Sequence, residues 1–369
     1  METAWLAAGA GGRPFAVARV VADAAGRRLA DPRMVVAGVQ ALRGLRRVNG
    51  ALGEWAAACG PRRILLAGPR SFCAGVERAV EIVELVLAER GSPVYVRRQI
   101  VHNAHVVADL EQRGSVFVDE LDDVSAGATV VFSAHGVSPA VREQARSRDL
   151  SVVDATCPLV GKVHLEARRF ATEGRTIFLI GHDGHEEVEG TIGEAPESIR
   201  LVEGIGDAER IQAPDPERVA YLTQTTLAVD ETDEIVERLR ARFPALHGPA
   251  SEDICYATAN RQHAVRAVAR ESDVVLVSGS ATSSNAKRLV EVSEREGTRA
   301  YLVDDVTDVD VAWLGGAKTV GITAGASTPE RIVGRLVAAL AALGPVEVEE
   351  RATTKESVQF RLPKELAAR

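Results

Sequence analysis

Lysine and cysteine are scarce in this chain of 369 residues, and long apolar runs are missing. Five of the 44 basic residues are Lys, and the net charge is −8. An acidic chain lacks the basic surface that nucleic-acid binding needs, so a nucleic-acid partner is not expected. No apolar run approaches the roughly 18 residues of a membrane-spanning helix, so no membrane association is expected. These absences favour a cytoplasmic protein.

The few cysteines and the absence of short metal or nucleotide motifs narrow the possible functions further. Four cysteines in a chain of this length do not form the framework of a disulfide-rich secreted protein. No CxxC or CxxH pair is present, which argues against a zinc finger, and no Walker or GxGxxG loop indicates a nucleotide. The cysteines are therefore buried thiols, metal ligands or a nucleophile.

Residues 1–61 differ from the rest of the chain. They contain no Lys and no Ser, and they carry eight Arg against four acidic residues. Organelle transit peptides are Ser-rich, and a secretory signal needs a continuous apolar segment, so neither is indicated. We interpret residues 1–61 as an N-terminal extension that is partly helical or disordered. Cys59 lies in this extension, outside the repeat described next.

The other three cysteines mark a threefold internal repeat. Each follows a short strand-like run and opens a helix-like run, and the runs that end at the cysteines read "RILLAGPRSFC", "LSVVDATC" and "EDIC". The helix after the first cysteine has apolar residues at spacings of three and four. These are Val76, Val80, Val83 and Val86. Two further strands in each unit end in polar loops.

Apolar strands that alternate with amphipathic helices predict an α/β fold of parallel sheets covered by helices. In such sheets ligands bind outside the carboxyl ends of the strands, where Cys, His, Ser, Thr and Asn occur in this chain. The repeat predicts the division 1–61 (extension), 62–156, 157–254 and 255–345 (three α/β units), and 346–369 (C-terminal strand and tail).

Three cysteines that converge from three units suit a soft metal. One filling is zinc with a fourth ligand, and another is a cubane iron–sulfur cluster with one iron that lacks a protein ligand. The third interpretation is that all three cysteines are core residues. The spacing of Cys73, Cys157 and Cys255 does not select among the three.

The strand-end loops supply imidazole, hydroxyl and carboxamide groups near predicted helix N-termini, a combination that suits an anion such as phosphate. The candidates are His102, His135, His182, His185, Thr223, Thr225, Thr226, Ser283, Ser284, Asn285 and Ser327. Lys287 is the only Lys close to these loops. Ser138 and Thr328 precede prolines at expected helix starts, so both are predicted to be N-caps.

The stretch "GHDGHEEVEGT", residues 181–191, offers three glutamates as general acids. A general acid needs a carboxyl group whose pKa is raised by burial or by a nearby anion. If this loop continues into a helix or strand, at most one or two of Glu186, Glu187 and Glu189 can face the site. The sequence does not select one.

The motifs together carry a resemblance to a known family. They include "PRSFCAGVERA", "VRRQIVHNAHVV", "FSAHGVS", "VDATCPLVGKVH", "GHDGHEEVEGT", "TQTTL", "EDICYAT" with "NRQ", "SSN" and "GITAGAS". Over about residues 62–365 the chain resembles 4-hydroxy-3-methylbut-2-enyl diphosphate reductase, the last enzyme of the non-mevalonate isoprenoid pathway. The resemblance implies a trefoil of three pseudo-repeated α/β units with small parallel sheets around a central metal cluster. It implies that Cys73, Cys157 and Cys255 ligate three irons of one 4Fe–4S cluster.

The resemblance also implies a reaction. The open iron binds the hydroxyl oxygen of the substrate, an allylic diphosphate, and ferredoxin or flavodoxin supplies two electrons. Water leaves, and Glu187 donates the proton that completes isopentenyl or dimethylallyl diphosphate. The substrate-binding residues implied are His102, His135, His185, Thr225, Ser283, Ser284, Asn285 and Ser327.

One departure and two alternative functions remain at this point. The family often has Pro between the His and the Glu of the stretch at 181–191, where this chain has Glu186, so an extra carboxyl group lies near the site. One alternative is a zinc or structural-metal protein that binds phosphorylated compounds without redox chemistry. The other is a hydro-lyase of the aconitase type, which uses an open cluster iron but no net electrons.

Overall fold

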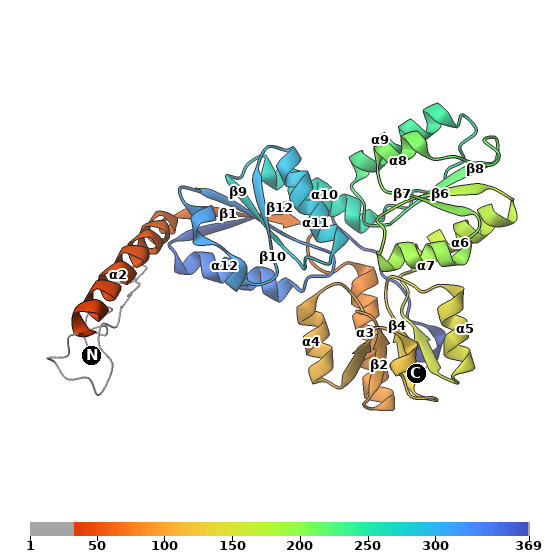
Figure 1. The fold of residues 1–369 in the computed structure, drawn as a ribbon, viewed down its shortest axis with the longest axis horizontal. Coiled ribbons are helices and arrows are strands. Elements are labelled where there is room, and N and C mark those ends of the chain that lie inside the picture. The colour runs from red at the N-terminus through yellow and green to blue at the C-terminus, as the bar shows by residue number, and fades with distance from the viewer. Residues whose placement is uncertain (1–32, 368–369) are drawn as a thin grey trace.

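The computed structural model describes residues 33–367, which form three α/β lobes (Figure 1). One long helix, α2 (Arg33–Ala58), projects from the lobe that contains β1 and β9 to β12. The rest of the extension, residues 1–32, lies outside the described residues. Neighbouring strands in all three sheets run parallel, so the predicted α/β class with small parallel sheets is confirmed.

The largest sheet has five strands in the order β10-β9-β11-β1-β12. Its strands are β1 (Arg62–Gly68), β9 (Val274–Ser278), β10 (Arg299–Val303), β11 (Thr319–Ala324) and β12 (Val346–Ala352). Its helices are α10 (Tyr256–Ala269), α11 (Ser284–Arg295) and α12 (Glu330–Ala342), with short 3-10 turns at Val306–Asp308 and Val311–Leu314. The all-buried strand β9 lies between two neighbours, which explains its continuous apolar run "VVLV".

The other two sheets are smaller. The four-stranded sheet has the order β3-β2-β4-β5. Its strands are β2 (Val94–Arg97), β3 (Ser115–Val118), β4 (Thr129–Phe132) and β5 (Ser151–Asp154). The helices of this lobe are α3 (Ala74–Arg90), α4 (Ala104–Gln112), α5 (Pro139–Ser147) and α13 (Lys364–Ala367), with a 3-10 turn at Leu121–Asp123. The three-stranded sheet has the order β7-β6-β8. Its strands are β6 (Thr176–Ile180), β7 (Ile199–Val202) and β8 (Val219–Thr223). The helices of this lobe are α6 (Pro158–Thr172), α7 (Glu186–Glu194), α8 (Ile205–Arg210) and α9 (Val229–Arg242).

Strand β1 falls within the predicted first unit, residues 62–156. It does not join the sheet of that unit and belongs to the five-stranded sheet instead. It is hydrogen-bonded between β11 and β12, with Ile64 opposite Val320 on one side and Val348 on the other. The predicted boundaries at residues 62 and 345 therefore do not coincide with the sheets. Strand pairing is a long-range contact, and the local apolar pattern of β1 carries no information about which partner it joins.

All three repeat cysteines begin helices, as predicted. Cys73, Cys157 and Cys255 are the N-caps of α3, α6 and α10. The apolar spacing predicted for α3 is confirmed, because Val76 and Val83 are buried on its core face. The carboxyl ends of the sheets and the amino ends of these helices therefore bring the three cysteines toward the centre of the molecule.

The strand predicted before Cys255 is absent from the described part of the chain. The Asp253 carboxylate instead accepts a hydrogen bond from the Thr223 N–H at 3.1 Å and pairs with Lys162 Nζ at 3.0 Å. The Cys255 N–H donates to the carbonyl of Thr225 at 3.0 Å. A four-residue run with a buried aspartate is thus fixed as a loop by polar contacts to β8 and α6.

One of the two predicted serine or threonine caps is correct. Ser138 caps α5 and accepts a hydrogen bond from the Val141 N–H. Thr328 does not cap α12, which begins at Glu330 with Pro329 as its N-cap. The Thr328 hydroxyl donates instead to the carbonyl of Ser278 at 3.0 Å and so joins the loop after β11 to β9. Among the described residues, no helix is both long and apolar enough to cross a membrane.

Candidate active site

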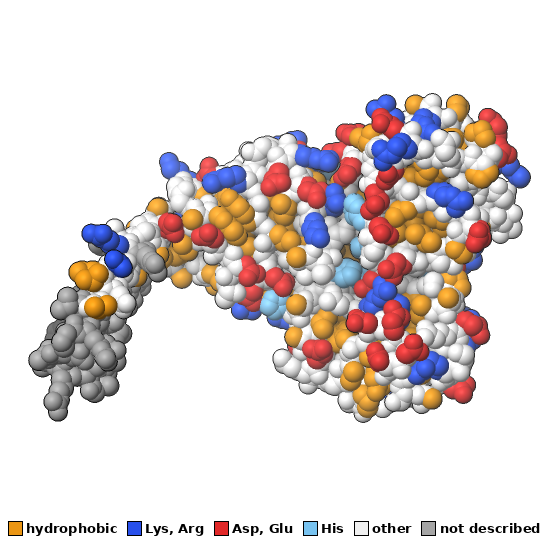
Figure 2. Space-filling view, viewed as in Figure 1, with side chains coloured by type: hydrophobic (Ala, Val, Ile, Leu, Met, Phe, Trp, Pro, Cys, Tyr) orange, Lys and Arg blue, Asp and Glu red, His pale blue; other side chains and the backbone are white. Residues whose placement is uncertain are grey.

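All twelve residues that the resemblance implies for the site line one cavity between the lobes. They are Cys73, His102, His135, Cys157, His185, Glu187, Thr225, Cys255, Ser283, Ser284, Asn285 and Ser327. A second, more open cleft lies outside it, and His102 and His185 line both. Figure 2 shows histidine side chains, in pale blue, in the hollow where the three lobes meet. Cys59 lies elsewhere, in a groove at the base of α2.

The three cysteines place their thiols at helix N-termini, where the helix dipole favours a thiolate. Cys255 Sγ accepts a hydrogen bond from the Thr258 N–H at 3.3 Å and lies 3.1 Å from the Thr258 hydroxyl. Burial, with a smaller contribution from the neighbouring thiols, nevertheless raises the pKa of Cys157 to about 12 and that of Cys255 to about 11. Cys157 and Cys255 therefore need a positively charged group beside their sulfurs to be ionised near neutral pH.

The distances between the sulfurs help to distinguish a single metal ion from a larger metal cluster. A single zinc ion with Zn–S bonds of about 2.3 Å needs sulfurs roughly 3.8 Å apart. Within the described chain, the only three-residue group whose ligand atoms all lie within 4.8 Å of one another is His102, His135 and Glu186. The three thiol sulfurs do not form such a group, so at least one pair of them lies more than 4.8 Å apart, which is wider than a mononuclear site requires. Three soft donors at this spacing suit a polynuclear iron–sulfur group.

Gly75, the second residue of α3, keeps the space beside the thiols open. A Cβ atom at this position would lie 2.8 Å from Cys157 Sγ and 3.8 Å from Cys73 Sγ. The first distance is well inside van der Waals contact, so any larger residue would displace the sulfur. Glycine therefore lets two cysteines from different helices approach one centre.

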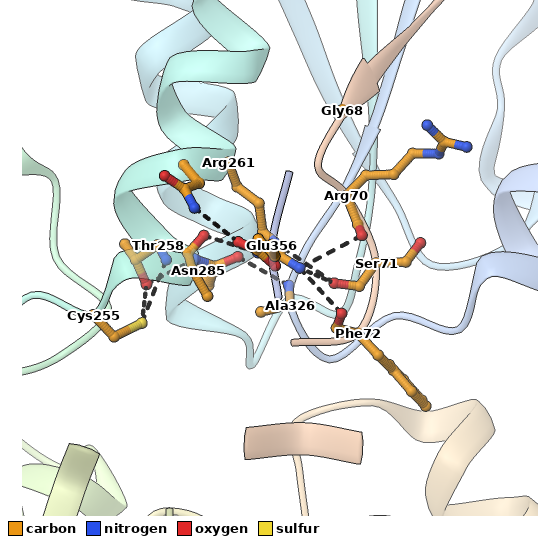
Figure 3. A network of polar contacts seen from close by, with 12 residues as sticks. Gly68, Arg70, Ser71, Phe72, Cys255, Thr258, Arg261, Asn285, Ala326 and Glu356 are labelled. Atoms are coloured by element: carbon orange, nitrogen blue, oxygen red, sulfur yellow. Dashed lines mark hydrogen bonds and ion pairs between the residues drawn. The ribbon is translucent and has the colours of Figure 1, made fainter. Parts of the chain in front are cut away.

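A buried arginine fixes the loop that leads to Cys73 (Figure 3). Arg261, on α10, is fully buried and donates to the carbonyls of Ser71 at 2.7 Å and Phe72 at 3.1 Å. It also pairs with Glu356, in the C-terminal segment after β12, at 3.0 Å. Ser71 has a φ of 60°, a left-handed conformation that a non-glycine residue holds only when its surroundings impose it. Arg261 therefore joins the two helices that begin at Cys73 and Cys255.

Sequence reasoning assigned no role to Arg261, although "NRQ" was among the motifs. The signal was available, because Arg261 lies on the apolar face of the α10 pattern between Ala257 and Val265, both buried. A charged residue on the buried face of an amphipathic helix needs a partner. The partner Glu356 is 95 residues away in sequence and could not be found from the pattern.

Replacing Arg261 with Met is expected to destabilise the protein by about 3–5 kcal/mol, because the partly buried Glu356 and two loop carbonyls lose their partner. Urea unfolding monitored by circular dichroism measures the change. The matched control is Arg63→Met, whose partner Glu349 lies 2.6 Å away on the sheet surface with both side chains more than a third exposed. That change is expected to cost less than about 1 kcal/mol. Equal losses in the two variants would contradict the role of Arg261.

Three histidines from three strand-end loops meet at the junction of the cavity and the cleft. His102 follows β2, His135 follows β4 and His185 follows β6. The rings of His102 and His135 stack with centroids 4.1 Å apart, and His185 lies edge-on at 5.4 and 5.8 Å from them. Burial, reinforced by neighbouring imidazoles, lowers the pKa of His102 to about 2 and that of His185 to about 3. These two rings are therefore neutral near pH 7.

His185 has a defined tautomer. It is the N-cap of α7, and its Nδ1 accepts a hydrogen bond from the Glu187 N–H at 3.2 Å. A neutral imidazole that accepts through one nitrogen carries its proton on the other. His185 therefore presents an Nε2–H donor, which suits an oxygen of a bound ligand.

The start of α7 at Glu186 separates the three glutamates. Glu187 is 2% exposed and lines the inner cavity. Glu186 lines the outer cleft, with Oε2 3.4 Å from His135 Nδ1. Glu189 is about half exposed and pairs with Arg98 at 2.7 Å. Consecutive helical residues point about 100° apart, which explains why Glu186 and Glu187 face different spaces.

Glu187 is held by both donors of one residue. Its Oε1 accepts from the Thr225 N–H at 2.7 Å, and its Oε2 lies 3.0 Å from the Thr225 hydroxyl. Burial raises the pKa of Glu187 to about 7, against the hydrogen bonds from Thr225, which lower it. A carboxyl group in this state carries a proton in a large fraction of molecules near neutrality and can act as a general acid.

The hydroxyl and amide residues come from α11 and from the loop after β11. Ser283 caps α11, and the Ser327 hydroxyl donates to the carbonyl of His102 at 3.0 Å. Asn285 joins Thr258 to the Ala326 N–H through hydrogen bonds of 3.2 and 3.0 Å. Three of the four candidate side chains thus already have protein partners.

The fourth of these side chains, Ser284, is different. Its Oγ is buried, and within the described chain it has no hydrogen-bond partner. A buried hydroxyl without a partner is costly, so a ligand that accepts from it is favoured. His182 belongs to the supporting structure, since its Nε2 lies 2.8 Å from Arg288 Nη2.

The matching family model and several similar relatives all point to one protein family. A family model described as LytB protein matches residues 64–341. The protein named 4-hydroxy-3-methylbut-2-enyl diphosphate reductase 2 from Mycobacterium bovis is 56% identical over 315 residues, which cover 84% of this chain and 96% of the relative. The 4-hydroxy-3-methylbut-2-enyl diphosphate reductase of Acidothermus cellulolyticus is 59% identical over 306 residues, which cover 83% of this chain and 90% of the relative.

Solved structures agree with the sequence relatives. The structure of the E-1-hydroxy-2-methyl-but-2-enyl-4-diphosphate reductase from Plasmodium falciparum matches with a TM-score of 0.80 at 38% identity, covering 83% of this chain and 97% of that one. A structure of (E)-4-hydroxy-3-methyl-but-2-enyl diphosphate reductase matches with a TM-score of 0.54 at 33% identity, covering 76% and 99%.

Proposed function

The chain belongs to the LytB protein family, and from that premise we propose that it reduces 4-hydroxy-3-methylbut-2-enyl diphosphate to isopentenyl and dimethylallyl diphosphate. One observation carries the proposal: three thiols, three imidazoles, a buried carboxylic acid and several hydroxyl groups line a single cavity. Metal ligands, anion-binding groups and a proton donor are what reductive removal of a hydroxyl group from a diphosphate ester needs. The names of the relatives support the same activity.

Cys73, Cys157 and Cys255 would hold a 4Fe–4S cluster that has one iron without a protein ligand. The sulfur spacing supports this assignment, as does the lack of a side chain at Gly75, where a Cβ would lie 2.8 Å from Cys157 Sγ. When bound, the cluster supplies the electrons that cleave the substrate's C–O bond, and ferredoxin or flavodoxin is the expected donor. In the net reaction two electrons and two protons enter, and one water leaves.

The protein groups around the diphosphate act mainly as hydrogen-bond donors. The proposed set is His102, His135, Ser283, Ser284, Asn285 and Ser327. Ser284 supports the assignment best, because its buried hydroxyl lacks a partner among the described residues. Lys287 lines the outer cleft and draws the anion in. His185 offers its Nε2–H on the substrate side, next to Thr225.

Glu187 is proposed as the proton donor. Its two bonds to Thr225 fix the direction of the carboxyl group, so the proton is delivered from a defined position. A bound diphosphate adds negative charge to the cavity, and like charge raises the pKa of a carboxyl group further. Substrate binding therefore helps Glu187 to keep its proton until the carbon centre takes it.

Anaerobic purification followed by metal analysis tests the proposed function. We expect a brown protein with about four iron and four sulfide per chain, and oxidation of reduced viologen when the hydroxylated diphosphate is added. Isopentenyl diphosphate, which lacks the hydroxyl group, is the control and is expected to leave the viologen reduced. A colourless protein with one zinc would exclude both iron–sulfur functions. A brown protein that leaves viologen reduced would favour the hydro-lyase.

Replacing Gly75 with Ala is expected to lower the iron content, because the added Cβ would lie 2.8 Å from Cys157 Sγ. Iron and sulfide per chain measure the effect. The control is Gly161→Ala on α6, where a Cβ meets nothing within 4 Å. Ala is favoured over Gly in a helix by about 1 kcal/mol, so both helices should form and only the first variant should lose iron. Full iron content in Gly75→Ala would contradict the assigned crowding.

A further inference from the structure

Glu186 is the acidic residue of the 181–191 stretch that the proposed function leaves without a role. Its side chain is only 12% exposed, at the wall of the outer cleft. Its Oε2 lies 3.4 Å from His135 Nδ1 and 3.4 Å from the Ser133 hydroxyl. Glu187 and Glu189, by contrast, have close partners in Thr225 and Arg98. A mostly buried carboxylate beside an imidazole needs an explanation.

A metal ion is one explanation, because His102, His135 and Glu186 place one ligand atom each within 4.8 Å of one another. The ring geometry argues against it. The two imidazoles stack at 4.1 Å with planes 21° apart. An imidazole binds a metal through a lone pair in the ring plane, so two stacked, nearly parallel rings direct their lone pairs side by side rather than to one point. The contact between Glu186 and His135 is therefore better explained as a direct pair.

The pair is well placed to hold a proton. His135 Nδ1 is buried and, within residues 33–367, has no hydrogen bond, while the Glu186 carboxylate lies at ion-pair distance. At 3.4 Å the Glu186 carboxylate lies within ion-pair distance of His135 Nδ1 but does not form a well-aligned hydrogen bond with it. The pKa of Glu186 is lowered, because the contacts with His135 and the charge of Arg98 outweigh burial, which raises it. Glu186 is therefore ionised near neutrality.

The groups around His135 include one ionised carboxylate in contact with its ring. The titratable and charged groups that line the cavity and the cleft around it are Arg98, His102, Asp119, His185, Glu186, Glu187, Lys287 and the thiols of Cys73, Cys157 and Cys255. Burial keeps His102 and His185 neutral, and Glu187, with a pKa of about 7, is turned toward Thr225. Glu186 is thus the ionised carboxylate that faces the stacked pair, and it contacts only one of the two rings.

We propose that Glu186 is a positioning residue that holds His135 as an imidazolium, with Nδ1–H directed to the carboxylate and Nε2–H directed to a diphosphate. This inference rests on the proposed function, because it assigns the cationic anchor of that same binding site. A carboxylate behind an imidazolium orients the ring and favours its protonated form, as in the carboxylate–histidine pairs behind many ligand-binding histidines. A charge-assisted hydrogen bond to phosphate oxygen is stronger than one from a neutral ring.

The alternative is that the Glu186 carboxylate simply repels the bound anion. The pH dependence of anion binding distinguishes this repulsion from the proposed effect on His135. Repulsion acts at every pH at which the carboxylate is ionised, so removing the charge would tighten anion binding throughout. Proton holding matters only at the higher pH, where an imidazole without the carboxylate loses its proton. Glu186→Gln is therefore expected to bind pyrophosphate about as well as the parent at pH 6 and about tenfold more weakly at pH 8.

Calorimetric titration of the anaerobic cluster-containing protein with inorganic pyrophosphate tests this at both pH values. Glu189→Gln removes the same charge from the same helix and is the matched control, with no change in the pH dependence expected. His135→Gln and the double variant complete a cycle, in which the effect of Glu186→Gln at pH 8 is expected to vanish once His135 is gone.

Two outcomes would overturn the inference: tighter pyrophosphate binding by Glu186→Gln at both pH values, or an equal loss at pH 8 with and without His135. Failure of the proposed function is recognised separately. It would appear as a parent protein that lacks the cluster or leaves viologen reduced, whatever the coupling between Glu186 and His135. A further check is turnover at pH 8, where Glu186→Gln should raise KM and change kcat by less than about twofold.

Discussion

Replacing Cys157 with Ser is expected to lower the iron content to well below one cluster per chain and to reduce viologen-linked activity by more than about 100-fold. The loss of a metal ligand costs more than the loss of a residue that only hydrogen-bonds to a ligand. The same result is expected for Cys73→Ser and Cys255→Ser. A serine hydroxyl is a harder and far less acidic ligand than a thiol, and it does not replace a thiolate at iron. The two remaining thiolates would leave a second iron of the proposed cluster without a protein ligand.

Because the three cysteines are helix N-caps, replacing them with serine should change the metal ligand without disturbing the helices. Cys73, Cys157 and Cys255 are N-caps, and serine is among the most favoured N-cap residues. Helices α3, α6 and α10 should therefore begin normally in each variant. Lost iron with an unchanged far-ultraviolet circular dichroism spectrum would assign the loss to the sulfur atom and not to the fold.

Cys59→Ser is the matched control. Cys59 is partly buried in the groove at the base of α2, together with Arg62 and Lys318, and does not line the central cavity. The same chemical change there is expected to leave iron content and activity unchanged. Full activity in any one of the other three variants would refute the assignment of that cysteine to the cluster.

The sequence predicted the features that depend on local patterns. Helix starts at Cys73, Cys157 and Cys255 follow from apolar spacing within a few residues, and the structure has each start where it was expected. The sheet that β1 joins was not predictable, because its partners β11 and β12 lie more than 250 residues away along the chain. Local propensity marks a strand but not its neighbours.

The candidate site shows the same limit at the level of single residues. The stretch at 181–191 supplied three glutamates, and only the helix start at Glu186 decides that Glu187 points inward and Glu186 into the outer cleft. An offset of one residue would have exchanged their places. Arg261 was missed for a related reason, since its partners, the Ser71 carbonyl and Glu356, become neighbours only in the folded chain.

Replacing Glu187 with Gln is expected to lower kcat by about 100- to 10,000-fold, the usual contribution of a general acid, while iron content and KM stay close to those of the parent. Gln is isosteric, and its carbonyl oxygen can still accept from the Thr225 N–H, so the local structure should be retained. The control is Glu189→Gln, which removes an exposed carboxylate from the same helix. Normal turnover in Glu187→Gln would move the acid to Glu186 or to the substrate's own diphosphate.

The raised pKa of Glu187, about 7 against an ordinary value of 4.5, also predicts the pH dependence of stability. A carboxyl group with a raised folded pKa contributes stability that is fully present below its unfolded pKa and is lost as pH rises through its folded pKa. The parent should therefore lose about 1.4 kcal/mol relative to Glu187→Gln between pH 6 and pH 8.5. Anaerobic urea unfolding at the two pH values measures this difference. Equal pH dependence in the two proteins would mean that Glu187 is already ionised at pH 6, held as a carboxylate by Thr225 and unable to serve as the acid.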